Sequence, residues 1–319
     1  MVRGILVVLF YMVCVDSVSA AQEIVPSVTL IRGAFVPGTQ PDGNTLVLKG
    51  SDGMIIFDTG RHVEHVQQIL DFAAATNAPV AAIVNSHWHL DHVGGNVVLR
   101  KAYPNAKVYA SAAIEDAMHG FLANYRAQLE DAIKQAGGDT AKQAPWRAEL
   151  ALIDAGPALF PDERITASVT KTIAGRRVRI GFESYAVTAG DVWLFDPATR
   201  VLASGDLVTL PAPLFDTACP ARWNAALGRL AKIDFKTLVP GHGAPMQRND
   251  FAIYRHAFDR LLACAHGKES KQTCIDGWLH DAKALIPAAD EALARSLLDY
   301  YIDASLRADP AQAKKFCAA

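Results

Sequence analysis

The feature that most constrains the fold is a short apolar run that ends in a cluster of polar side chains. Residues 80–84, Val-Ala-Ala-Ile-Val, form a continuous apolar stretch that predicts a buried strand. His87, His89, Asp91 and His92 follow this run directly. In an open α/β sheet, ligand-binding groups gather where the strands end. The sequence therefore predicts an α/β fold with a functional site at this edge of a sheet.

The flanking sequence repeats one order of elements. Residues 27–57 contain short strand-like runs separated by Gly, Pro, Asn and Asp, and a helical pattern follows over residues 63–73. A second strand-rich stretch covers residues 164–208, with a helical pattern over residues 220–232 after it. This twofold order indicates two halves packed sheet against sheet.

Helical patterns outside this repeat predict an insertion and a C-terminal extension. Residues 112–135 have a long helical pattern that ends at a Gly-Gly pair, and a polar stretch through Pro145 follows. We expect an insertion at about residues 111–160 within a domain of residues 21–250. Further helices are expected in residues 251–319.

The polar cluster has the composition of a metal site. Imidazole nitrogens and carboxylate oxygens are the usual ligands of Zn²⁺ and of other borderline divalent ions. His87, His89, Asp91 and His92 lie within six residues and can point at one small volume. Three imidazoles this close repel one another when charged and compete for partners when neutral. A purely structural role for the cluster is therefore disfavoured.

The cluster resembles the His-x-His-x-Asp-His signature of the metallo-β-lactamase superfamily. Three further motifs extend the resemblance: Ile55–Gly60 (IIFDTG), Ser204–Val208 (SGDLV) and Val239–Gly243 (VPGHG). It covers most of residues 27–246. The resemblance implies an α/β fold of a particular kind, a four-layer αββα sandwich of two mixed β-sheets flanked by helices, here with a C-terminal helical extension.

The resemblance also implies a site for two metal ions. One ion would be held by Asp91, His92 and His242, with Asp206 bridging to the other. The second ion would take His87 and His89, share Asp206, and need one more histidine. Zn²⁺ is the default ion for such a site, in one or two copies, and Fe and Mn are alternatives.

The histidine that would complete the second set of ligands is absent. In the family it stands in a segment of the type His-Thr-x-Gly-Asp, and Val187 occupies its place here. No histidine lies between His119 and His242. Glu183 and Tyr185 share the strand face of Val187 by alternation. Glu183 either reaches inward as a substitute ligand or is a carboxylate at the surface or the core edge.

Two functions follow from the implied site. The first is a metal-dependent hydrolase that uses metal-bound hydroxide on an ester, lactone, lactam or similar small-molecule bond. Asp91 would be its catalytic residue, which orients the nucleophile or moves a proton. The alternative is a metal-binding accessory or sensing protein with weak or no hydrolytic activity, because one metal position is incomplete.

The N-terminus predicts export. Arg3 precedes an apolar run over residues 5–15, and small residues at 18–20 precede a cleavage point after Ala20. We interpret residues 1–20 as a signal peptide and expect a periplasmic or secreted protein with no stable membrane span after cleavage. The apolar run is too short to cross a bilayer comfortably.

Four cysteines follow the predicted signal peptide, at positions 219, 264, 274 and 317. An even number in an exported chain indicates two disulfides, for which three pairings exist. We favour Cys264 with Cys274, which closes a short loop, and Cys219 with Cys317. Buried free thiols are the alternative interpretation.

Charge indicates the kind of partner. The chain has 31 basic and 33 acidic residues, a formal net charge of −2, and its longest basic run is the short Gly175–Arg179 segment. A nucleic-acid partner is therefore not expected, and a small-molecule substrate is. The oligomeric state stays open.

Several single residues also carry expectations. Asp58 is expected to hydrogen-bond a ligand histidine and to fix its orientation. His62 and His65 are expected at the surface, and Phe215 is a candidate for substrate contact. Phe121 and Tyr125 are among the aromatic residues of the insertion that could line a mouth over the metals.

Overall fold

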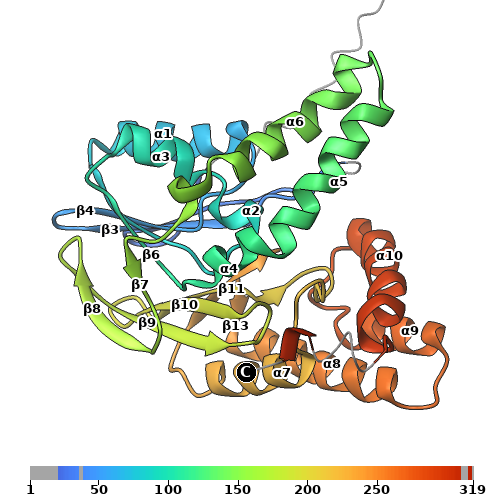
Figure 1. Cartoon of the computed structure of the whole chain (residues 1–319). Coiled ribbons are helices and arrows are strands. Elements are labelled where there is room, and N and C mark those ends of the chain that lie inside the picture. Colours follow the sequence, from blue (N-terminus) through green and yellow to red (C-terminus); the bar gives the residue numbers. More distant parts are fainter. Residues whose placement is uncertain (1–20, 36–38, 310–314, 318–319) are drawn as a thin grey trace, which may run out of the picture.

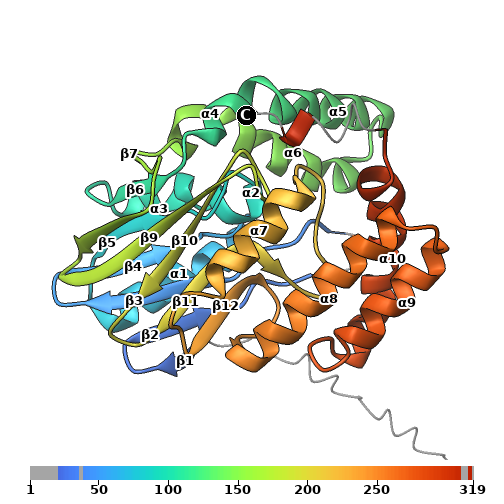
Figure 2. The ribbon, with the colours of Figure 1, turned by 90° about the horizontal axis from the view of Figure 1, so that it is seen from below.

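We describe the protein from a computed structural model of the chain, which describes residues 21–35, 39–309 and 315–317. Two β-sheets lie face to face and helices cover their outer faces (Figures 1 and 2). The fold class is therefore the predicted four-layer αββα sandwich with a helical C-terminal region. The predicted signal peptide lies outside the described residues, and the domain boundaries stay a prediction.

The first sheet follows chain order. Within the described residues its strands are β1 (Gln22–Val25), β2 (Val28–Ile31), β3 (Thr45–Gly50), β4 (Gly53–Phe57), β5 (Val80–Val84), β6 (Lys107–Ala110) and β7 (Glu163–Arg164). The strands from β1 to β4 pair antiparallel, with tight turns between β1 and β2 and between β3 and β4. From β4 to β7 the pairs are parallel, because helical segments connect these strands.

The second sheet has the order β13-β12-β11-β10-β9-β8. Its strands are β8 (Val169–Ile173), β9 (Arg176–Ser184), β10 (Gly190–Asp196), β11 (Val201–Thr209), β12 (Thr237–His242) and β13 (Met246–Gln247). Only β11 and β12 pair parallel within this described sheet, with a helix in the connection between them. The carboxyl ends of β5, β11 and β12 carry the predicted site residues.

Three apolar layers hold the sandwich together. Between the sheets, Leu30, Leu48 and Ile55 of the first sheet belong to the same buried cluster as Ile180 and Leu194 of the second. Outside the first sheet, helices α1 (Val63–Thr76) and α3 (Asn96–Ala102) bury an apolar face against the strands. Outside the second sheet, α7 (Pro220–Leu230) and α8 (Arg248–His266) do the same. Each sheet is thereby buried on both faces.

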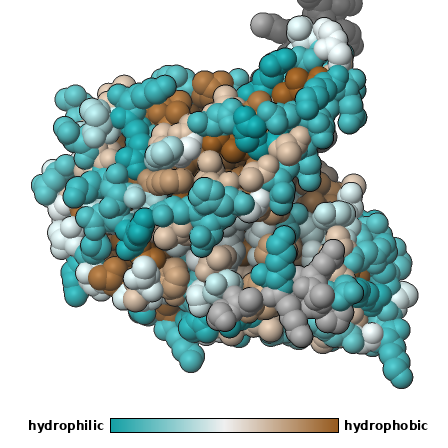
Figure 3. Space-filling model, viewed as in Figure 1, coloured by the Kyte–Doolittle hydropathy of each residue, from teal (hydrophilic) through white to brown (hydrophobic). Residues whose placement is uncertain are grey.

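Besides α3, the chain between β5 and β7 forms α2 (Leu90–Val93), α4 (Ala113–His119), α5 (Phe121–Gln135), α6 (Thr140–Asp154) and the short η1 (Gly156–Leu159). Helices α5 and α6 project from the sandwich as a hairpin (Figure 1). The polar stretch expected through Pro145 is instead the start of α6, which the Asp139 carboxylate caps by accepting from the Lys142 amide. Figure 3 shows hydrophobic side chains along this hairpin, on a face that is otherwise mostly hydrophilic.

The C-terminal region packs against α8, which itself covers the second sheet (Figure 2). It comprises α9 (Lys271–Asp281), η2 (Ala288–Asp290), α10 (Glu291–Tyr301) and the π-helical η3 (Ile302–Leu306). Two disulfides, Cys264–Cys274 and Cys219–Cys317, confirm the favoured pairing. None of the helices in the described part of the chain combines the length and the apolar character that crossing a membrane requires.

Candidate metal centre

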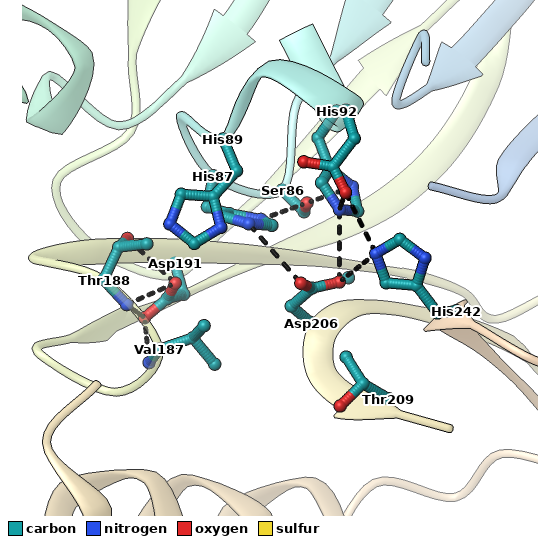
Figure 4. A network of polar contacts seen from close by, with 12 residues as sticks. Ser86, His87, His89, His92, Val187, Thr188, Asp191, Asp206, Thr209 and His242 are labelled. Atoms are coloured by element: carbon teal, nitrogen blue, oxygen red, sulfur yellow. Dashed lines mark hydrogen bonds and ion pairs between the residues drawn. The ribbon is translucent and has the colours of Figure 1, made fainter. Parts of the chain in front are cut away.

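The loop after β5 is held in a tight turn by hydrogen bonds to its own backbone. The Asn85 side chain donates to the His92 carbonyl oxygen at 3.0 Å, and the Asn96 side chain donates to the Asn85 oxygen at 2.8 Å. These bonds draw the start of α2 back onto the end of the strand. His87, His89, Asp91 and His92 therefore face one volume, as Figure 4 shows for its labelled histidines.

A bulge in β11 brings Asp206 to the same volume. Gly205 has a φ of 53°, and the pairing of β11 with β12 shifts register on both sides of it. A Cβ atom at Gly205 would lie 2.3 Å from the Cβ of Ser86, so only glycine fits this close approach. The bulge turns the Asp206 carboxylate toward the histidines, and His242 reaches it from the end of β12.

The structure brings together all six residues that the sequence singled out. His87, His89 and Asp206 form one group whose ligand-type atoms lie within 4.8 Å of one another. Asp91, His92 and His242 form a second group with the same spacing. Asp206 joins the groups, because one of its oxygens lies 3.2 Å from His92 Nε2 and the other 3.7 Å from His87 Nε2.

The atoms that face the centre fit a divalent metal ion. The Nε2 atoms of His87, His92 and His242 and the Oδ1 atom of Asp206 are buried and have no hydrogen-bond partner among the described residues. Leaving one buried polar atom unpaired costs about 1–3 kcal/mol, so four such atoms in one place need a common partner. Nitrogen and carboxylate donors in this number and arrangement suit Zn²⁺ and related ions.

The outward-facing atoms of the histidines have partners. Asp58 Oδ2 lies 2.8 Å from His92 Nδ1, and the Ser86 hydroxyl donates to the same carboxylate at 2.7 Å. The Ser86 oxygen lies 2.9 Å from His87 Nδ1. These contacts turn Nε2 of both rings toward the centre. Asp58 thus makes the contact expected from the sequence.

Burial and charge set the ionisation of the site. Burial, helped by the neighbouring histidines, lowers the pKa of His87 well below its ordinary value, and burial also lowers the pKa of His89. Burial opposes charge on His92 as well, but carboxylates, Asp206 foremost, outweigh it and raise the pKa of His92 well above its ordinary value. The same histidine overcomes burial to lower the pKa of Asp206 and Asp91. Metal binding needs ionised carboxylates and neutral imidazoles, so His92 has to release its proton when an ion binds, whereas His87 and His89 are already neutral.

Val187 stands where the missing histidine was expected. Its side chain is buried, and its backbone N–H donates to Asp191 Oδ2 at 3.0 Å. The Thr188 N–H and hydroxyl also donate to Asp191. Glu183 does not serve as a substitute ligand: its carboxylate accepts from Trp193 Nε1 at 3.2 Å and from Arg229 Nε at 2.7 Å. It is a buried carboxylate that is neutralised by α7.

Two expectations for single residues are wrong. His65 is buried, not at the surface, and its Nε2 lies 2.8 Å from Thr45 Oγ1, because α1 turns it toward β3. Phe215 is only 1% exposed and packs on Trp223 and Phe258, with ring centroids 5.1 and 5.9 Å away. It belongs to the core beneath the C-terminal helices and does not reach a substrate cavity.

A buried ion pair that sequence reasoning missed supports Asp91. Arg61 Nη1 donates to Glu149 Oε2 at 2.7 Å, and its Nη2 lies 3.4 Å from Asp91 Oδ1. The side chains of Arg61 and Glu149 are 9% and 8% exposed. Arg61 directly follows the Asp-Thr-Gly turn, which was a signal for it, whereas Glu149 lies 88 positions away on α6 and had none.

A cavity opens beside the metal centre. It has a volume of about 220 Å³, and its lining includes His89, Trp88, Phe121 and Tyr125. A larger cavity of about 910 Å³ lies under the hairpin of α5 and α6 and shares Arg61 and Tyr125 with the first. Phe121 and Tyr125 therefore lie where the sequence placed a mouth.

Comparisons with known proteins agree with this geometry. The family model described as "Metallo-beta-lactamase superfamily" matches residues 38–242. A linear primary-alkylsulfatase from Pseudomonas sp. (strain ATCC 19151) is 25% identical over 222 residues, which cover 63% of this chain and 41% of that protein. A hydroxyacylglutathione hydrolase from Synechococcus sp. (strain JA-3-3Ab) is 49% identical over 47 residues, which cover 15% of this chain and 19% of that protein. This chain thus spans less than half the length of the alkylsulfatase in that match.

Solved structures share the fold. A metallo-beta-lactamase from Pontibacter korlensis has a TM-score of 0.53 and 20% identity, over 73% of this chain and 94% of that one. The stereoselective inverting sec-alkylsulfatase Pisa1 from Pseudomonas sp. has a TM-score of 0.60 and 18% identity, over 88% of this chain and 50% of that one.

Proposed function

Because the chain belongs to the metallo-beta-lactamase superfamily, we propose that it is an exported metal-dependent hydrolase that cleaves an ester, lactone, lactam or similar bond of a small molecule. The observation that carries this proposal is the set of buried, unpaired nitrogen and oxygen atoms that converge from three strand ends. Burying such a set without a cation costs free energy, because its polar atoms have no other partner among the described residues. It also lies beside a cavity large enough for a small substrate group.

The proposed ligands fall into two positions. The first position uses His87, His89 and Asp206, and the second uses Asp91, His92 and His242 with Asp206 shared between them. We propose Zn²⁺ as the ion, in one or two copies. When bound, such an ion polarises a substrate oxygen and lowers the pKa of a water molecule to about 7.

Asp91 is the proposed catalytic residue of the chain. Its Oδ2 atom faces His242 Nε2 at 3.1 Å, and its Oδ1 atom is held by Arg61. A carboxylate fixed in this way can accept a hydrogen bond from the attacking water and hold its lone pair toward the scissile bond. The pKa of Asp91 lies well below its ordinary value, so the group stays an acceptor.

The cavity limits the substrate groups next to the scissile bond. Trp88 and Phe121 lie with ring centroids 5.3 Å apart and form an aromatic wall beside His89. We propose that this wall contacts an apolar part of the substrate. Because one relative is an alkylsulfatase, alkyl sulfates belong in the substrate panel together with carboxylic esters, lactones and β-lactams.

The test combines metal content with turnover. Elemental analysis of protein purified without added zinc should give one ion per chain that is lost in His242→Ala, or two ions, of which the second is lost in His87→Ala. The same samples are assayed against the four substrate classes. Turnover that disappears with chelation and in His242→Ala supports the proposal. Absence of bound metal from all samples contradicts it.

A metal-binding accessory or sensing role is the second candidate, and the replacement at Val187 favours it. A first position with two histidines and a shared carboxylate should bind its ion more weakly than a position with three histidines and the same carboxylate. Tight binding of one ion at the second position, without turnover of any substrate in the panel, would support this role. Turnover by the one-metal protein would contradict it.

Export is the remaining part of the proposal. Two disulfides are typical of proteins that mature in an oxidising compartment. Fractionation of cells that express the full chain should recover the protein, shortened by about 20 residues as signal peptides are, outside the cytoplasm. An uncleaved cytoplasmic protein with four free thiols would refute this part alone.

A further inference from the structure

A threonine hydroxyl joins His89 to the backbone of Val187. Thr217 lies in the loop between β11 and α7 and is 4% exposed. Its Oγ1 atom lies 3.1 Å from His89 Nε2 and 2.9 Å from the Val187 carbonyl oxygen. The contact therefore connects a proposed ligand with the position that lacks one.

The direction of these two hydrogen bonds follows from chemistry. A hydroxyl group carries one hydrogen, and a carbonyl oxygen can only accept. The Thr217 hydrogen therefore goes to the Val187 oxygen. The Thr217 oxygen must then accept from His89, so the proton of the His89 ring sits on Nε2. Its Nδ1 atom is left with a free lone pair, on the side of the ring that faces Asp206 in Figure 4.

We propose that Thr217 is a positioning residue, which uses the Val187 carbonyl to hold His89 in the Nε2-protonated tautomer with Nδ1 directed at the first metal position. This proposal rests on the proposed metal site and goes beyond it. A position that has lost one histidine depends more strongly on the orientation of the two that remain. Partners that fix a ligand histidine typically change metal affinity by about 10- to 100-fold.

Both ends of this connection are anchored. On one side, Asp191 accepts from the N–H groups of Val187 and Thr188, which fixes the direction of the Val187 carbonyl. On the other side, Cys219, two residues after Thr217, donates its N–H to the Ala186 carbonyl oxygen at 2.8 Å. These backbone contacts keep the threonine between its two partners.

The C-terminal region holds the same loop from outside. The Tyr301 hydroxyl donates to Asp216, and the Ser305 hydroxyl donates to the Phe215 carbonyl oxygen at 3.1 Å. The Cys219–Cys317 disulfide is a third tie. We infer that the C-terminal helices matter to the site because they position Thr217.

The experiment compares Thr217→Val with Thr217→Ser. Valine keeps the shape and removes the hydroxyl, whereas serine keeps the hydroxyl. The affinity of each metal position is measured by zinc competition with a chromophoric chelator. We expect Thr217→Val to weaken the first position by at least 10-fold and to leave the second unchanged. The affinities of Thr217→Ser should stay within about threefold of the wild type at both positions, because serine keeps the hydroxyl. A change of about 10-fold or more is expected only when the hydrogen bond to the histidine is lost.

A matched control separates this role from loss of packing. The Thr209 hydroxyl also donates to a backbone carbonyl, that of Ala212 at 2.9 Å, but among the described residues it has no hydrogen bond to an imidazole. Thr209→Val should leave the affinity of the first position unchanged. An equal loss in Thr209→Val and Thr217→Val would overturn the proposal, and so would wild-type affinity in Thr217→Val.

The tautomer is read separately from metal binding. Long-range ¹H–¹⁵N spectra of the metal-free protein should show His89 protonated on Nε2 in the wild type and in Thr217→Ser, and a mixture of tautomers in Thr217→Val. A wild-type ring protonated on Nδ1 would overturn the proposal. Because this readout needs no metal, it decides the role of Thr217 even if metal analysis refutes the proposed function.

Discussion

Replacing Glu149 by glutamine tests whether the projecting hairpin supports the metal centre. Glutamine keeps the shape of the side chain and removes the charge that faces Arg61 at 2.7 Å. Removing one partner of a buried ion pair typically costs 3–5 kcal/mol, because the other charge is left uncompensated. Here Asp91 remains 3.4 Å from Arg61 and offsets part of that cost. We expect Glu149→Gln to lower the free energy of unfolding by about 2–3 kcal/mol.

The same substitution should weaken metal binding. Without Glu149, Arg61 has Asp91 as its remaining ion-pair partner among the described residues and competes for that carboxylate with the ion. We expect the affinity of the second metal position to fall about 10-fold. Urea unfolding with a chelator present isolates the effect on the fold, and chelator competition isolates the effect on metal binding. Coincident transitions by circular dichroism and tryptophan fluorescence are needed for the comparison.

Asp154 on the same helix provides the control. It pairs with Arg126 of α5 at 2.8 Å, but both side chains are well exposed. Exposed ion pairs contribute little, so Asp154→Asn should leave both the unfolding transition and the metal affinities unchanged. If Glu149→Gln unfolds like the wild type, or if Asp154→Asn is as destabilising, the hairpin does not support Asp91 through Arg61.

Three further predictions concern metal, disulfides and pH. Chelation should lower the free energy of unfolding by about 4 kcal/mol for an ion previously present at about 1,000 times its Kd, and an unchanged urea midpoint would argue against a bound ion. Replacing Cys219 and Cys317, which lie 98 positions apart, with serine should lower the free energy of unfolding by about 5 kcal/mol. Replacing Cys264 and Cys274, which lie 10 positions apart, should lower it by about 3 kcal/mol. A larger loss in urea denaturation for the second pair would contradict the chain-entropy account. Burial raises the pKa of Asp191 from 3.8 to about 7. The protonated carboxyl therefore favours the folded state, and this stabilisation is lost as pH rises. Relative to Asp191→Asn, the free energy of unfolding of the wild type should fall by about 4 kcal/mol between about pH 4 and pH 7. A difference between the two proteins that does not change with pH would refute this.

The parts of the site that could be predicted are those encoded locally. Residues 87–92 carry four candidate ligands, three histidines and one aspartate, so their convergence follows from a short stretch of chain. Asp206 and His242 lie far away but sit in motifs that resemble those of a known family. The layers of the fold could be predicted from the order of strands and helices, because hydrophobic periodicity and turn residues are also properties of short stretches of chain.

The parts that could not be predicted depend on what lies across from a residue. Alternation placed Glu183 on one strand face with Val187, and this is wrong, because β9 ends at Ser184 and Val187 lies in the loop that follows. Alternation also could not show that Arg229 of α7 neutralises Glu183. The aromatic character of Phe215 fits a cavity wall and a core equally well, and the helices after residue 250 decided for the core. Thr217 gave no signal, because its role is defined by two partners that are distant in sequence.

The tie between Cys219 and Cys317 gives the site an order of maturation. All six proposed ligands have been synthesised once His242 has emerged, 75 residues before Cys317 in the printed sequence. The loop that carries Thr217 gains its covalent anchor only after Cys317 has been translated and has formed a disulfide with Cys219. An ion that arrives earlier meets a ring whose orientation is not yet secured. If Thr217 positions His89 as proposed, thiol oxidation should precede tight loading of the first metal position, and chains that meet the ion before Cys219 and Cys317 are oxidised should hold it more weakly at that position.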